Sequence, residues 1–69
     1  MTPQEIAIQL SKIDWTAIEV DNAYETEKLR HIALELLKLD KKDMIKVLLS
    51  VMEGNNFHIK IMLSILSET

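Results

Sequence analysis

One stretch of the chain carries three side chains whose types and spacing suit metal binding. Glu27, His31 and Glu35 follow one another at intervals of four residues, which places them on one face of a helix. Carboxylate oxygens and imidazole nitrogens are both zinc ligands. However, the sequence indicates no pocket around these three residues, and such patterns are common on solvent-exposed helix faces. We expect no metal site here and no cofactor elsewhere.

Nucleophilic catalysis has little support in this sequence. The single glycine cannot build a phosphate-binding loop, and the absence of cysteine excludes disulfides and Cys-based zinc sites. Four serines lie within predicted helices, namely Ser11, Ser50, Ser64 and Ser67. No histidine or acidic residue is placed to activate any of them as a nucleophile. We therefore predict a protein that is not an enzyme and has no evident small-molecule substrate.

The second histidine, His58, has a different setting from His31. In helical projection it falls between Met62 and Ile65, inside the apolar arc of the last predicted helix. A single histidine in such an arc is more often a satisfied core or interface residue than a ligand. The sequence leaves open whether His58 is structural or lies in an interface, where its protonation would make assembly pH-dependent.

The elements that position these side chains are helices, and the first has a clear start signal. Thr2 and Glu5 have the spacing of a capping box, and Pro3 occupies the first helical position. This pattern predicts a helix over residues 3–12. The chain therefore begins with a well-defined element.

The next predicted element covers residues 15–39, which contain neither Gly nor Pro. Asp14 is a cap candidate, and Thr16 with Glu19 offers a second capping box. We expect one long helix, kinked near residues 21–22, in preference to two separate helices. The apolar residues that line one face of its second half are Leu29, Ile32, Ala33, Leu36 and Leu37. We expect the aromatic residues Trp15 and Tyr24 to pack in the core, with an exposed partner anchor as the alternative.

Two further helices complete the chain. Asp40 caps a helix over residues 41–53, and Gly54 ends it in the left-handed conformation. One of the two asparagines that follow caps a last helix over residues 57–67. The sequence thus predicts an all-α fold, a compact bundle of four helices, or five if residues 15–39 divide.

The last two helices are more apolar than a small bundle needs. Apolar residues cover about 200° around the axis of helix 41–53 and about 240° around that of helix 57–67. A helix that lies on a core needs an apolar stripe of only about 100°. We expect one compact bundle to enclose one of these helices and to leave the other, most plausibly the last, with an apolar face for an interface.

These patterns predict a small protein–protein interaction module that self-associates or docks on another protein. A homodimer is the first choice, because symmetric dimers are the commonest soluble oligomers. The residues that we expect to bind the partner are Leu49, Met52, Phe57, His58, Ile61 and Ile65.

Chain length and net charge limit the domain organisation and the kinds of partner that remain. The 69 residues predict a single helical domain over residues 1–69, and the net charge of −3 argues against nucleic acid and anionic membranes as partners. Residues 41–66 have the outline of a helix-turn-helix, but Lys60 is the only lasting positive charge on its second helix. We expect no signal peptide and no membrane span, and therefore a cytoplasmic protein.

Two other functions stay open at this point. The chain could be a small acidic antagonist of a basic enzyme or of a nucleic-acid-binding protein. The acidic residues that would form its surface are Glu19, Asp21, Glu25, Glu27 and Glu35. It could also be a transcription-associated regulator, whose small basic patch would have to be extended by a dimer partner.

Overall fold

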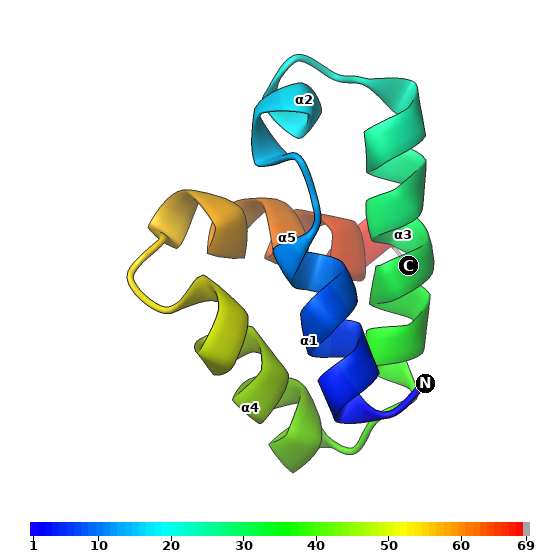
Figure 1. Ribbon diagram of the computed structural model, residues 1–69, viewed down its shortest axis with the longest axis vertical. Helices are drawn as coiled ribbons and strands as arrows, with labels where there is room; N and C mark the ends of the chain where they lie inside the picture. Colours follow the sequence, from blue (N-terminus) through cyan, green and yellow to red (C-terminus); the bar gives the residue numbers. More distant parts are fainter. Residues whose placement is uncertain (69) are drawn as a thin grey trace.

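The computed structural model describes residues 1–68 as five α-helices joined by short turns, with no strand among these residues (Figure 1). The all-α bundle predicted from the sequence is confirmed, in its five-helix form. The helices in chain order are α1 (Pro3–Ser11), α2 (Trp15–Glu19), α3 (Ala23–Leu37), α4 (Lys41–Met52) and α5 (Asn56–Glu68).

The capping box predicted at the start of α1 is present. The backbone N–H of Glu5 donates to Thr2 Oγ1 at 3.2 Å, and the backbone N–H of Thr2 donates to Glu5 Oε1 at 3.2 Å. The bond from the Thr2 backbone and then the bond from its hydroxyl lower the pKa of Glu5, because both stabilise the charged carboxylate. Lys12 ends the helix as its C-cap.

The single long helix expected over residues 15–39 is wrong, because the chain breaks between α2 and α3. Asp21 adopts the left-handed conformation with φ of 59°, which a right-handed helix cannot contain. Asn22 then caps α3, since its side-chain oxygen accepts from the backbone N–H of Glu25 at 3.0 Å. Asp and Asn tolerate these conformations better than most residues, which explains why the break falls at this pair.

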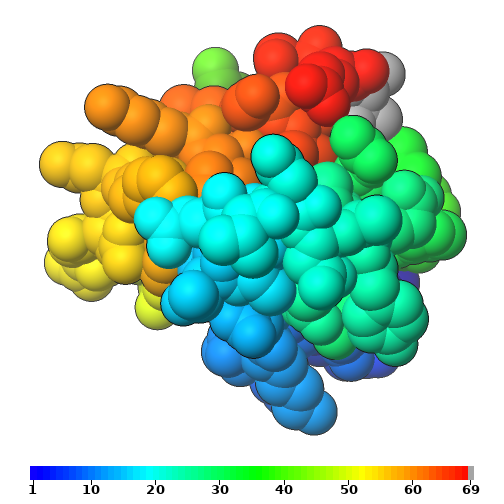
Figure 2. Space-filling model, turned by 90° about the horizontal axis from the view of Figure 1, so that it is seen from above, coloured from blue at the N-terminus to red at the C-terminus, as the bar shows by residue number. Residues whose placement is uncertain are grey.

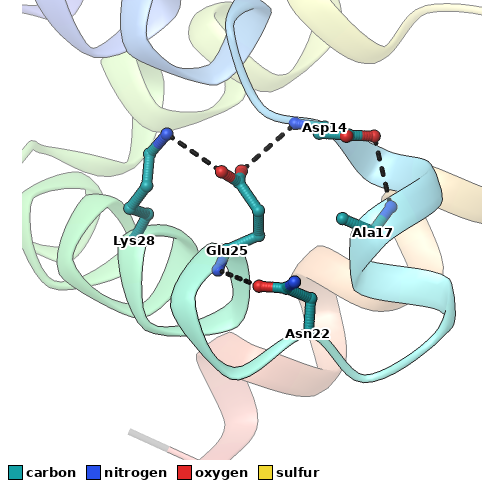
Figure 3. Close-up of polar contacts among 5 residues, drawn as sticks. All are labelled: Asp14, Ala17, Asn22, Glu25 and Lys28. Carbon is teal, nitrogen blue, oxygen red and sulfur yellow. Dashed lines mark hydrogen bonds and ion pairs between the residues drawn. The ribbon is translucent and has the colours of Figure 1, made fainter.

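The cap of α2 is the first of the two candidates that the sequence offered. Asp14, and not Thr16, caps α2, because its carboxylate accepts from the backbone N–H of Ala17 at 3.2 Å (Figure 3). The backbone N–H of Asp14 donates to Glu25 Oε2 at 3.3 Å, and Lys28 Nζ lies 3.2 Å from Glu25 Oε1. One carboxylate of α3 thus fixes the start of α2.

The ends of α4 and the start of α5 follow the sequence prediction. Asp40 caps α4 by accepting from the backbone N–H of Asp43 at 2.8 Å. Gly54 has φ of 80°, where any side chain would be strained, and it turns the chain away from α4. Asn55 then accepts from the backbone N–H of His58 at 3.1 Å and so caps α5.

The core lies between α3 and the helices packed around it. Helices α1, α2 and α5 all contact α3, and α4 packs on α1 and α5. Figure 2 shows the cyan residues that join α2 to α3 lying beside the orange and red residues of α5. The buried side chains are Ile6, Leu10, Ile13, Ile18, Leu29, Ile32, Ala33, Leu36, Val47, Met52, Met62 and Ile65.

Two residues of α3 are more exposed than the sequence predicted. Leu37 is 43% exposed, because it lies about 100° around the helix from Leu36, at the edge of the buried face. Tyr24 is 74% exposed, so the expected core position is wrong for this residue. Its ring lies in the first turn of α3, with Lys28 Nζ 5.6 Å from the ring centroid.

Neither α4 nor α5 is enclosed, although the sequence led us to expect that one of them would be. Each helix buries only part of its wide apolar arc. Leu49 of α4 and Leu63 of α5 are exposed, whereas Met52 and Met62 are fully buried. The excess apolar surface is therefore shared between the two helices.

Candidate functional site

An apolar groove lies between α4 and α5. The two helices diverge from the turn that joins them (Figure 1). The groove has a volume of about 200 Å³ and is lined only by apolar side chains, which are Ile45, Leu48, Leu49, Met52, Ile59, Met62 and Leu63. We call this feature the α4–α5 groove.

The floor and the rim of the α4–α5 groove differ in exposure. Met52 and Met62 form a floor and are each 1% exposed. The rim side chains Leu49 and Leu63 are 58% and 55% exposed, and Ile45 is 46% exposed. A helix presents such a rim when residues three and four positions apart share one face, as Ile45 and Leu49 do. The groove therefore offers apolar contact area to another molecule.

The structure divides the six partner-binding residues expected from the sequence between three places. Leu49 and Met52 lie in the α4–α5 groove. Phe57, Ile61 and Ile65 lie on the other side of α5, in a hollow that α5 forms with α2 and α3. The sixth residue, His58, faces α2.

The hollow beside α2 and α3 is chemically mixed. It is open to solvent, and it includes Ile65, which is buried, and Phe57, which is 45% exposed. Its polar and charged lining residues are Glu19, Asp21, Thr26, Arg30, Lys60, Ser64 and Glu68. Because charges of both signs surround its apolar floor, this hollow is less suited to apolar docking than the α4–α5 groove.

Sequence reasoning missed five residues of the groove, namely Ile45, Leu48, Ile59, Met62 and Leu63. Their signal was present, because Ile45, Leu48 and Met52 repeat at helical spacing, as do Ile59, Met62 and Leu63. What the sequence lacked was the direction in which each helix faces the core. That direction depends on contacts with α1 and α3, and it decides which part of an apolar arc stays open.

His58 packs against an aromatic ring of α2. The rings of Trp15 and His58 are stacked, with centroids 4.2 Å apart and planes at 14°. His58 Nε2 also lies 3.3 Å from the side-chain nitrogen of Asn55. Trp15 is half-buried against the core, as expected. The stack joins α2 to the first turn of α5, which gives His58 a structural role within the chain.

The acidic residues proposed for an antagonist surface are largely paired with basic neighbours. Besides the contacts of Glu25, Glu27 lies 3.4 Å from Arg30, and Glu35 lies 3.3 Å from Lys38. Each pair is formed by residues three positions apart on α3. The basic partners reduce the net negative charge that this face offers to a cationic protein.

The Glu27–His31–Glu35 stripe is not drawn together into one ligand set. His31 Nε2 lies 3.6 Å from Glu27 Oε1, but Glu35 turns to Lys38. Within residues 1–68, no cluster of three or more His, Cys, Asp or Glu side chains has the arrangement to hold a metal ion. The stripe is therefore a set of local polar contacts along α3.

Comparison of the chain with protein-family models, curated proteins and solved structures found no match. Among residues 1–68, none of the helices combines the length and the apolar character needed to cross a membrane.

Proposed function

We propose that this protein is a non-enzymatic interaction module that self-associates through the α4–α5 groove. The observation that carries the proposal is the groove itself, whose lining is wholly apolar and whose rim residues Ile45, Leu49 and Leu63 are about half exposed. Contiguous exposed apolar surface is typical of protein–protein interaction sites. Burial of this surface against a partner would be favourable at about 25 cal/mol per Å² of apolar area.

A second copy of the chain is the partner that we propose first. The volume of about 200 Å³ suits one or two large apolar side chains, and the exposed Leu49 and Ile45 of another copy are of that kind. A two-fold symmetric contact would place each groove against the rim residues of the other copy. A different protein that presents an apolar helix is the alternative partner. We propose the cytoplasm as the location, since a chain without cysteine needs no oxidising compartment to fold.

Substitution of Leu49 by Gln tests the proposal, with Leu34→Gln as the matched control. Both leucines are exposed residues of helices, at 58% and 48%, but only Leu49 lines the groove. Gln has nearly the helix propensity of Leu, so neither variant should unfold. We expect Leu49→Gln to weaken self-association at least about tenfold, since each copy loses a buried leucine contact. Sedimentation equilibrium over a range of concentrations measures this change.

Two results would overturn the proposal. One is a wild-type chain that stays monomeric at millimolar concentration, which would move the search to a different protein partner. The other is equal weakening by Leu49→Gln and Leu34→Gln, which would show that the groove is not the interface. Self-association through apolar contacts should also change little with ionic strength, whereas binding by an acidic antagonist would weaken steeply in salt.

A further inference from the structure

Helix α4 ends on a charge that opposes its own dipole, and its first turn carries charges of both signs. Lys41 and Lys42 occupy its first turn, where the helix end is partly positive, and Glu53 stands at its C-cap, where the end is partly negative. Asp40 and Asp43 offset the lysines at the start, but the last turn has no basic residue to offset Glu53. An isolated helix is destabilised by this arrangement, so it favours a neighbour of opposite polarity.

Two of these charged residues, Lys42 and Glu53, lie on the outward face of α4, next to the groove. Lys42, Lys46, Leu49 and Glu53 follow one another at spacings of four, three and four, which is one stripe of a helix. All four residues are exposed. Within residues 1–68, neither Lys42 nor Glu53 takes part in an ion pair. The stripe is therefore basic at one end, acidic at the other, and unpaired along its length.

We propose that a second copy docks with its α4 antiparallel to the first across a two-fold axis, so that Lys42 of each copy lies opposite the partner's Glu53. This inference rests on the proposed self-association and specifies its geometry. The antiparallel arrangement forms two equivalent ion pairs and sets each basic helix start beside an acidic helix end. A parallel arrangement would place like charges together, which is unfavourable.

The same register buries the apolar part of the stripe. It sets Lys46 beside the partner's Leu49, where the methylene stem of the lysine covers the leucine and its ammonium group stays in water. Ile45, which lies on the rim of the groove one stripe further round the helix, is then at the edge of the contact on the groove side. Burial of apolar area at the centre of the α4–α4 contact thus supplies affinity. The charges at its two ends determine the relative direction of the helices.

Helix α5 does not offer the same self-complementary pattern. Its outward residues Lys60 and Ser64 carry one positive charge between them, and the acid nearest its end, Glu68, lies 3.9 Å from Arg30 of α3. Two copies of α5 would therefore bring Lys60 near a second lysine without a compensating acid. For this reason we assign the two-fold contact to α4 and a flanking position to Leu63 of α5.

Charge-reversal variants test the register. Lys42→Glu and Glu53→Lys each place two like-charged pairs in the contact, and we expect each to weaken self-association about 10- to 30-fold. The double variant restores opposite charges and should associate within about threefold of the wild type. An equimolar mixture of the two single variants, one of them isotope-labelled, should form heterodimers in native mass spectrometry. Lys12→Glu, at the C-cap of α1, is the control with the same charge change and no expected effect on self-association.

Unfolding cannot imitate the expected result, because both reversals improve the charge–dipole pairing of α4 and should leave the melting temperature of the monomer equal or higher. A double variant as weak as the single variants would overturn the antiparallel register, as would single variants that associate like the wild type. If these outcomes occur while Leu49→Gln still weakens association at least about tenfold, the register fails and the proposed function stands. If the wild type is monomeric, the proposed function fails first.

Discussion

The first three helices and the last two handle their apolar and charged side chains differently. In α1 and α3, Ile6, Leu10, Leu29 and Leu36 are 0% exposed. The carboxylates on α3 pair with basic residues three positions away, as the contact between Glu25 and Lys28 illustrates. In α4 and α5, by contrast, half-exposed leucines line an apolar groove, and the lysines of α4 have no ion-pair partner within residues 1–68.

This difference distinguishes the residues that stabilise the fold from those available for the proposed interaction. In the first region the exposed apolar side chains do not line the groove, and most carboxylates of α3 have a basic partner. A region that leaves both kinds of side chain open to solvent is stabilised further by a partner. Large apolar side chains of the first region are also exposed, but none of them lines the groove; they include Ile8, Val20, Tyr24, Leu34 and Leu37. Substitutions in the two regions should therefore act on different quantities, one on unfolding and the other on association.

The largest expected effect belongs to the buried region. Leu36→Ala removes a side chain that is 0% exposed and should lower the free energy of unfolding by about 2–5 kcal/mol. Leu49→Gln, by comparison, should change the unfolding of the dilute monomer by less than about 0.5 kcal/mol. Urea denaturation followed by circular dichroism measures both values. Similar losses for the two variants would remove the distinction between the regions.

An intermediate effect is expected at the cap that starts α4. Asp40→Ala removes the acceptor of the 2.8 Å bond from the Asp43 backbone and should lower the free energy of unfolding by about 1 kcal/mol. Since the loss frays the turn that precedes Ile45, self-association should weaken as well. The same pair of measurements, denaturation and sedimentation, follows both quantities. Unchanged association with reduced stability would show that the start of α4 lies outside the contact.

The smallest expected effect is a pH dependence at the start of α1, far from the groove. The hydrogen bonds from Thr2 lower the pKa of Glu5 in the folded chain, so the charged carboxylate is favoured by folding. The stabilisation is present above the pKa of the unfolded chain, and it is lost as the pH falls through the lower folded value. Glu5→Gln should therefore make stability less dependent on pH in the acid range. Urea denaturation between about pH 3 and pH 7 measures the slope, and equal slopes for the two proteins would contradict the account.

The sequence predicts most of the local structure because local signals determine it. The caps at Thr2 and Asp40 and the turn at Gly54 depend on residues within one helical turn, and the structure confirms all three. The sequence places the irregularity correctly at Asp21-Asn22 but favours a kink over a break, because the absence of Gly and Pro is given more importance than this Asp-Asn pair. That pair has weak helix propensity and a tolerance of left-handed backbone.

The candidate site is less predictable, because it depends on how the helices are turned against one another. The width of the apolar arcs indicates that α4 and α5 have excess apolar surface, and Leu49 and Met52 lie in the groove. The sequence does not reveal that α5 turns Phe57 and Ile65 towards α2 and α3. The stack of His58 on Trp15 joins residues that are far apart in the chain, so helical projection cannot find it.

A dilution series followed by methyl NMR tests the central claim most directly, because it compares the two regions in one experiment. As the concentration rises and association proceeds, we predict that the methyl resonances of Ile45, Leu49 and Leu63 shift together, while those of Ile8 and Leu34 stay fixed. Shifts centred on Ile8 and Leu34, or no shift in either region, would contradict the claim that this chain self-associates through the α4–α5 groove.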